Sequence, residues 1–236
     1  MKRVYKLLSI IAVLSLFSSA MQAQFVVASD SIKGQIEFCP RPGDLTNSTL
    51  VPNDSVFYMY PPDLEIDPWR YVDFYTSSRK TQRGYIRGTQ LMRIDDYELI
   101  DVERLSAHGS VSFNEKDVKV NVSVTPIRSN TSIKQTDKGY IVNGKLAKGV
   151  AKGQSPSLKY QSISVTIKGR TIALPKKLYE HLLEPEIDNM VVYYNPQKKI
   201  VYILANNGGI DAYYNVLWAV SHKGTANVYV FDPYEK

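Results

Sequence analysis

The fold class of this chain is indicated most clearly by one alternating stretch, Val118-Lys119-Val120-Asn121-Val122-Ser123-Val124. Every second residue is valine, so an extended strand would carry one apolar face and one polar face. Valine also favours strands because its branched side chain packs well on a pleated surface. We therefore expect residues 118–124 to form a half-buried β-strand within a larger sheet.

The sequence after this stretch continues in short apolar runs that are separated by turn residues. Asn143-Gly144 divides the run 140–146, and this pair supplies the positive φ angles of a type I′ hairpin turn. Lys168-Gly169 divides residues 163–174 in the same manner. Strands joined by such short turns lie antiparallel beside one another. The last third of the chain predicts four more strands of this kind, at 190–194, 200–205, 213–220 and 228–231.

One helix is expected in this half of the chain, at 175–184. Pro175 suits the first turn of a helix, where its missing N–H is not needed. Leu178, Leu182 and Leu183 would then share one side, and Pro185 would end the helix.

The region before residue 95 predicts short strands at 56–60, 69–74 and 84–88, separated by Pro- and Gly-rich turns. Trp69-Arg70-Tyr71-Val72 is followed by Gly84-Tyr85-Ile86 and then by Leu91. This order resembles that of the bacterial SH3-like domain over residues 30–95, although six residues, 63–68, are inserted before the tryptophan. The resemblance implies a small barrel, in a family that uses its surface to contact cell-wall peptides.

Together these patterns predict an all-β protein: an SH3-like small barrel followed by an antiparallel β-sheet domain with one short helix. We place the SH3-like domain at 24–98 and a linker at 99–112, where the periodicity is lost. The second domain then covers 113–236 and contains the helix 175–184.

The first 23 residues predict export. Three cationic residues precede an apolar run at 7–17, and small residues end the segment at Ala23, the pattern of a cleaved signal peptide. The run is shorter than the ~20 apolar residues of a membrane-spanning helix. We therefore expect a periplasmic or extracellular protein that starts near Gln24 and has no integral membrane span.

Charge and cysteine content narrow the function classes. Cleavage would remove three positive charges and no negative ones, which lowers the formal net charge from +6 to +3. This balance does not predict nucleic-acid binding, which needs a dense basic surface. Cys39 is the single cysteine, so no intramolecular disulfide can form.

The sequence does not predict an enzyme. A cysteine peptidase needs a thiolate beside a histidine base, and the second domain has no cysteine. The three histidines lack the paired spacing of zinc ligands, and no Gly-x-Ser-x-Gly motif occurs. We predict no catalytic residues, no metal and no cofactor, and keep an unrecognised cell-wall hydrolase as one alternative.

Aromatic residues supply the first candidate binding site. Alternate residues on a strand share one face, so Tyr58 lies with Tyr60 and Trp69 lies with Tyr71. If these faces point outward, they form together with Tyr85 an aromatic groove for an extended peptide. If they point inward, they form the core of the small barrel.

The second candidate site is the loop at 208–214. Gly208-Gly209 permits a tight hairpin corner, and Asp211, Tyr213 and Tyr214 follow it. Tyrosine brings large contact area and a hydroxyl at low entropic cost, so a protruding loop of this composition suits protein recognition. Either this loop is only a corner, or it serves a secreted inhibitor or immunity protein as its contact element.

The sequence therefore predicts a non-catalytic, exported binding protein of the bacterial cell envelope. Its expected partner is cell-wall peptide or an envelope protein. The inhibitor or immunity protein that acts through the 208–214 loop is the main alternative.

Overall fold

The computed structural model describes residues 25–61, 66–75, 81–107, 109–128 and 133–233. The expected signal peptide, residues 1–23, lies outside this part. The described chain is all-β, built from antiparallel sheets with short 3-10 turns between them. Within it, no helix is long and apolar enough to cross a membrane.

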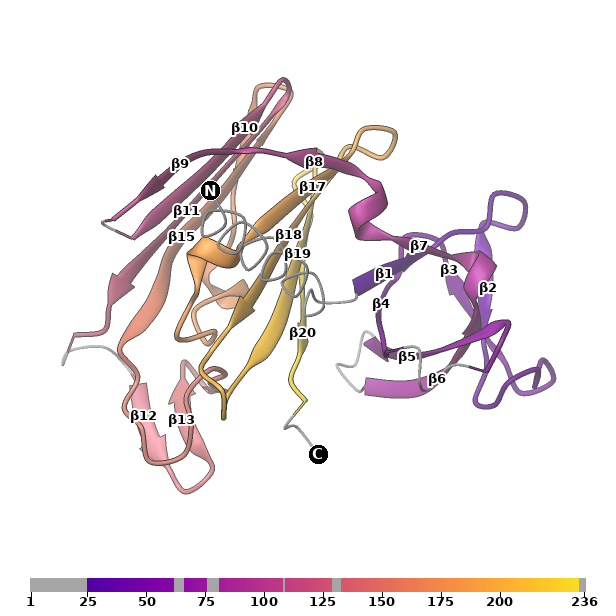
Figure 1. Cartoon of the computed structure of the whole chain (residues 1–236), viewed down its shortest axis with the longest axis horizontal. Helices are drawn as coiled ribbons and strands as arrows, with labels where there is room; N and C mark the ends of the chain where they lie inside the picture. Colours follow the sequence, from indigo (N-terminus) through magenta and orange to yellow (C-terminus); the bar gives the residue numbers. More distant parts are fainter. Residues whose placement is uncertain (1–24, 62–65, 76–80, 108, 129–132, 234–236) are drawn as a thin grey trace, which may run out of the picture.

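Three five-stranded sheets stand side by side (Figure 1). We name them by their place in the stack. The N-terminal sheet has the order β6 (Thr81–Arg87), β5 (Trp69–Tyr75), β4 (Val56–Met59), β1 (Phe25–Ala28) and β7 (Leu91–Arg93). The middle sheet has the order β20 (Ala226–Phe231), β19 (Tyr214–Ser221), β18 (Ile200–Asn207), β17 (Val191–Asn195) and β8 (Glu98–Ile100). The outer sheet has the order β16 (Arg170–Ala173), β15 (Leu158–Ile167), β11 (Val118–Pro126), β10 (Ser110–Glu115) and β9 (Val102–Ser106).

Two smaller sheets complete the fold. The hairpin β2 (Gln35–Phe38) and β3 (Thr49–Pro52) packs against the N-terminal sheet. The strands β12 (Ile133–Thr136), β13 (Gly139–Val142) and β14 (Lys145–Leu146) form a three-stranded extension beside the outer sheet. β2 reaches the N-terminal sheet by a single bridge between Cys39 and Tyr85, and the expected barrel is not closed.

The alternating stretch forms β11 as predicted. Val118, Val120 and Val122 are buried, whereas Lys119 and Asn121 are exposed. β11 is the middle strand of its sheet and pairs with β10 on one side and β15 on the other. The two predicted hairpins also form, and their turn residues Asn143-Gly144 and Lys168-Gly169 adopt positive φ angles.

The middle sheet is apolar on both faces. One face carries Val201, Ile203, Val216 and Trp218, which pack against valines and isoleucines of the outer sheet. The alternate residues on the other face include Tyr202, Leu204 and Leu217, which pack against Phe25, Val27 and Val56 of the N-terminal sheet. The near-continuous apolar runs of β17, β18 and β19 follow from this double burial. Hence the two expected domains share a continuous apolar contact.

The prediction of a helix at 175–184 was wrong. A 3-10 turn spans Lys176–Leu178, and the chain then turns away at Tyr179. Leu182 and Leu183 are fully buried, and each forms an isolated β-bridge. The Leu183 N–H donates to the carbonyl of Lys148, and the Lys148 N–H donates to the carbonyl of His181. The indole N–H of Trp218 donates to the Leu178 carbonyl. These tertiary hydrogen bonds replace those that a helix would make.

The expected linker at 99–112 also differs. It contains the end of β8, all of β9 and the start of β10, and the chain passes from the middle sheet to the outer sheet at Asp101. Four of the five side chains of β9 are exposed, since it is an edge strand. This exposure explains why no alternating pattern marks β9 in the sequence.

The double burial of the middle sheet can be tested at Leu217, which is fully buried on the face toward the N-terminal sheet. We expect Leu217→Ala to lower the free energy of unfolding by about 2–5 kcal/mol, because it leaves a cavity between two sheets. Leu50→Ala, at a side chain that is 57% exposed, is the matched control and should change it by less than about 0.5 kcal/mol. Urea denaturation followed by tryptophan fluorescence measures the free energy of unfolding of both variants. An equally small loss in the two variants would contradict burial of the middle-sheet face that points toward the N-terminal sheet.

Candidate functional site

The five aromatic residues of the first candidate site stand on the outer face of the N-terminal sheet. Cross-strand partners on this face are Tyr71 with Tyr85 and Trp69 with Arg87. The alternate residues Phe57, Val72 and Ile86 point to the opposite face, where they pack against the β2–β3 hairpin. The aromatic residues thus face away from the core beneath the β2–β3 hairpin, although Tyr58 and Tyr60 pack against the apolar contact with the middle sheet and Trp69 is buried.

Four of these residues form a continuous line, which we call the tyrosine row: Tyr58, Tyr60, Tyr71 and Tyr85. The ring centroids of Tyr60 and Tyr71 are 5.1 Å apart, and those of Tyr71 and Tyr85 are also 5.1 Å apart. Tyr58 meets Tyr60 edge-on at 5.9 Å. All four side chains are partly exposed. Tyrosines in this arrangement present apolar ring surface and hydroxyl groups together.

Trp69 lies beside the row and is less accessible. Its side chain is 7% exposed, and the Arg87 guanidinium carbon lies 5.1 Å from the centre of its ring. This cation–π contact covers the indole. A ligand on the row would therefore meet Arg87 before it meets Trp69.

A buried carboxylate fixes the row from below. Asp73 is 2% exposed and lies on β5 directly opposite Arg83 on β6. The hydroxyl of Tyr60 donates to Asp73 Oδ2 at 2.8 Å, and Arg83 Nε donates to Asp73 Oδ1 at 3.2 Å. Burial raises the pKa of the Asp73 carboxyl, although both partners act in the opposite direction. Asp73 thus holds Tyr60 and Arg83 in fixed positions on the outer face.

The middle sheet covers one end of the row. Tyr58 stacks on Phe231 of β20 with the ring centroids 3.6 Å apart and the planes 4° from parallel. Burial raises the pKa of the Tyr58 hydroxyl to about 12, so this group is neutral at physiological pH. The other end, at Tyr71 of β5 and Tyr85 of the edge strand β6, lies away from this contact.

The second candidate site meets the first at this contact. Tyr213 donates its hydroxyl hydrogen to Asn215 Oδ1 at 2.5 Å, and Asn215 Nδ2 donates to the Tyr58 hydroxyl at 3.3 Å. Tyr58 and Asn215 are 157 positions apart in the chain, yet they belong to one surface. Tyr213 therefore extends the tyrosine row toward the loop.

The remaining loop residues divide between tip and core. Asp211 is exposed, and Ile210 beside it is 92% exposed. Tyr214 is fully buried and donates to the Leu183 carbonyl at 2.9 Å. The expectation that Tyr214 contacts a ligand is thus corrected, because its side chain fills the core between the middle and outer sheets.

Several residues of this surface were not found from the sequence: Asp73, Arg83, Arg87, Asn215 and Phe231. The first three residues could have been found from the two-residue period of a strand. Asp73 continues the alternation of Trp69 and Tyr71 on β5, and Arg83 and Arg87 stand two positions either side of Tyr85 on β6. Asn215 and Phe231 reach the row only through the packing of two sheets, for which the sequence carries no local signal.

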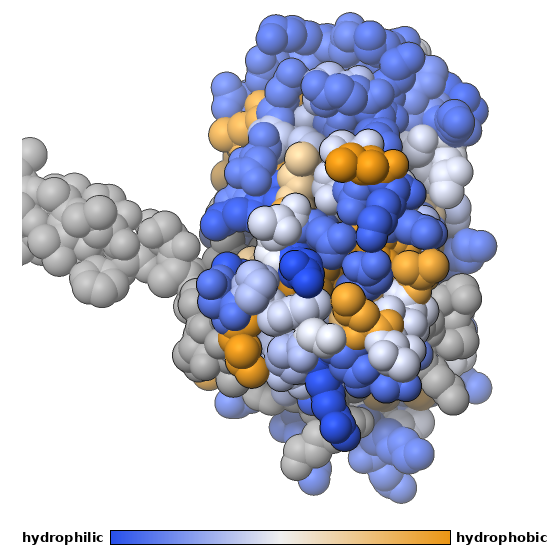
Figure 2. Space-filling view, turned by 90° about the vertical axis from the view of Figure 1, so that its right-hand side faces the viewer, coloured by the Kyte–Doolittle hydropathy of each residue, from blue (hydrophilic) through white to orange (hydrophobic). Residues whose placement is uncertain are grey.

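Among the described residues no group of three or more His, Cys, Asp or Glu gathers as metal ligands. Cys39 is buried, and burial raises the pKa of its thiol. On the face of the N-terminal unit shown in Figure 2, hydrophobic residues stand apart from one another among hydrophilic ones.

Comparison of the chain with protein-family models, with curated proteins and with solved structures gave no match.

The charge state of Asp73 gives a pH-dependent prediction. Because burial raises its pKa above the ordinary 3.8, the folded protein holds this proton more tightly than the unfolded chain does. The contribution of Asp73 to the free energy of unfolding is then greatest below pH 3.8 and declines as the pH rises through the raised pKa. Relative to Asp73→Asn, the wild type should lose stability as the pH rises from 3.8 through the raised pKa of Asp73.

Urea denaturation of both proteins across this pH range measures the difference. Asp137→Asn removes one carboxylate from an exposed turn and serves as the control. A wild-type advantage that grows with pH would show instead that the Arg83 ion pair outweighs the burial of Asp73.

Proposed function

We propose that this protein is a non-catalytic, exported binding protein of the cell envelope, which takes an extended peptide on the tyrosine row. The observation that carries the proposal is the line of partly exposed tyrosines held in place by the buried Asp73 and by Arg83. A rigid aromatic surface loses little entropy on binding, which favours recognition over a flexible surface of the same area. The order of aromatic residues and glycine that resembles the SH3-like domain supports the same assignment.

The chemistry of the row suits a peptide for three reasons. Ring faces spaced at 5.1 Å offer repeated apolar contacts along an extended chain. Tyrosine hydroxyls can hydrogen-bond to the ligand backbone. Arg83, whose side chain is 59% exposed, and Arg87 place positive charge beside the row, which favours peptides that carry carboxylates. Cell-wall peptides and acidic segments of envelope proteins both meet these conditions.

One specific observation favours the inhibitor alternative. The loop tip carries Ile210, which is 92% exposed, beside the exposed Asp211. An apolar side chain that is this exposed is able to fill a pocket on a partner protein. In this alternative Ile210 and Asp211, rather than the row, contact the partner protein.

The row is tested by a double substitution at its open end. We expect Tyr71→Ala with Tyr85→Ala to weaken binding to insoluble peptidoglycan, or to a protein in an envelope extract, by at least about tenfold, because both ring contacts are lost. Tyr140→Ala, at a partly exposed tyrosine of β13 outside the row, is the matched control and should bind as the wild type does.

Co-sedimentation and pull-down with the purified protein measure the two cases, and circular dichroism verifies the fold of each variant. Unchanged binding by the folded double variant would overturn the row as the binding surface. If Ile210→Ala with Asp211→Ala abolished capture of a single envelope protein at the same time, the inhibitor alternative would replace it.

A further inference from the structure

The edge strand β9 combines exposed apolar residues with an unoccupied sheet edge. β9 ends the outer sheet, and no strand of the described chain pairs with its far side. Val102 is 54% exposed and Leu105 is 51% exposed. Natural edge strands usually avoid such residues, because an open edge with apolar side chains recruits another strand.

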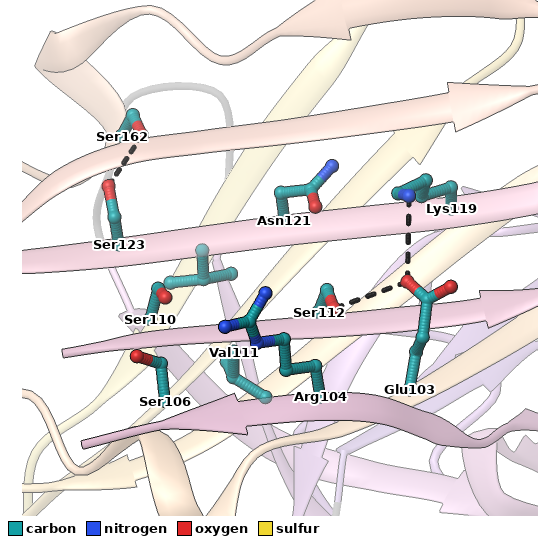
Figure 3. A pocket seen from close by; sticks show the side chains of 11 residues that line it. Glu103, Arg104, Ser106, Ser110, Val111, Ser112, Lys119, Asn121, Ser123 and Ser162 are labelled. Atoms are coloured by element: carbon teal, nitrogen blue, oxygen red, sulfur yellow. Dashed lines mark hydrogen bonds and ion pairs between the residues drawn. The ribbon is translucent and has the colours of Figure 1, made fainter. Parts of the chain in front are cut away.

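A bulge gives β9 an unusual order of side chains. The register with β10 shifts by one residue, so Val102 lies opposite Phe113 while Arg104 lies opposite Ser112. Val102 and Leu105 lie opposite the buried residues Phe113 and Val111, and so they face the inner side of the outer sheet. Glu103 and Arg104 both face the other side, as Figure 3 shows.

Along β9, the apolar side chains of Val102 and Leu105 therefore point inward, and the charged side chains of Glu103 and Arg104 between them point outward. This order is its own complement when two copies run antiparallel about an axis between residues 103 and 104. Val102 of each copy then meets Leu105 of the other on the inner side. Glu103 of each copy meets Arg104 of the other on the outer side.

We propose that two copies of this protein associate through their β9 edges, joining two five-stranded outer sheets into one continuous sheet across a two-fold axis. In this arrangement apolar side chains meet on the inner side of the sheet, and opposite charges meet on the outer side. An interface with two-fold symmetry uses the same patch on both copies, and β9 supplies such a self-complementary patch.

Glu103 and Arg104 differ in their surroundings. Glu103 is held by Lys119 at 3.5 Å, by Asn114 Nδ2 at 3.0 Å and by Ser112 at 3.3 Å, so its carboxylate leans over β10 toward β11 (Figure 3) and must turn toward the edge to meet a second copy. The Arg104 side chain makes no hydrogen bond or ion pair among the described residues, whereas its backbone pairs with Ser112 of β10. Both residues line a polar hollow of about 680 Å³ on the outer sheet, which a second copy would extend across the axis.

The opposite edge of the same sheet lacks this property. β16 carries Arg170, Thr171, Ile172 and Ala173, with no acidic residue to pair with the arginine of a second copy. The self-complementary order is thus a feature of β9 rather than of every edge in the sheet. This inference is independent of the peptide-binding function proposed above.

Charge exchange tests the proposal directly. The wild type should show twice the monomer mass in sedimentation equilibrium at the upper end of a series from about 1 to about 200 µM, a range that brackets weak and moderate interfaces. Glu103→Arg and Arg104→Glu, each alone, bring like charges together and should weaken the dimer by at least about tenfold. The two substitutions in one chain restore opposite charges and should restore the dimer.

Two controls match the changes in net charge. Asp137→Arg repeats the change made by Glu103→Arg, and Lys134→Glu repeats that made by Arg104→Glu, both at exposed residues of the β12–β13 hairpin. These variants should dimerise as the wild type does. A wild type that stays monomeric throughout, single variants that dimerise normally, or a double variant that stays monomeric would each overturn the proposal.

Hydrogen exchange provides a measurement without any substitution. Amides of residues 102–106 that face the open edge should exchange more slowly at high protein concentration than at low, whereas those of β16 should not change. Exchange in β9 that is independent of concentration would overturn the proposal, and would leave the edge to a strand from another protein.

Discussion

The middle sheet must bury both of its faces, and the rest of the structure depends on this constraint. Alternate residues of β17, β18 and β19 belong to two different apolar cores. A sheet of this kind exposes a large apolar area to water unless a layer covers each side. The outer sheet covers one face of the middle sheet, and strands β1 and β4 of the N-terminal sheet cover the other face. The N-terminal sheet is therefore held by burial of apolar area.

The candidate site follows from the same contact. The outer face of the N-terminal sheet is covered where β1 and β4 meet the middle sheet, and the tyrosine row leads from there to β5 and β6. Tyr58 lies at the boundary, stacked on Phe231 and bonded to Asn215. Because that boundary is packed like a core, the row begins from a rigid end, and Asp73 extends this rigidity to Tyr60 and Arg83.

The sequence predicted the strands better than the connections between them. β11 was predictable because its valines alternate, and the hairpins at Asn143-Gly144 and Lys168-Gly169 because their turns need positive φ angles. The prediction of a helix at 175–184 was wrong because the backbone of His181 and Leu183 is hydrogen-bonded to Lys148, a residue far away in the sequence. β9 was missed because a bulged edge strand with exposed side chains shows no period. Of the candidate site, the tyrosines were predictable, but their meeting with Tyr213 and Asn215 was not.

The sequence by itself determined that this chain is all-β and antiparallel, because alternation and turn chemistry act between neighbouring residues. It also determined which tyrosines share a face, since that depends on the two-residue period of a strand. The tertiary structure alone decided which face is buried, because burial depends on a partner sheet that lies elsewhere in the chain. For the same reason it alone decided that Tyr214 belongs to the core and that Tyr213 joins the tyrosine row.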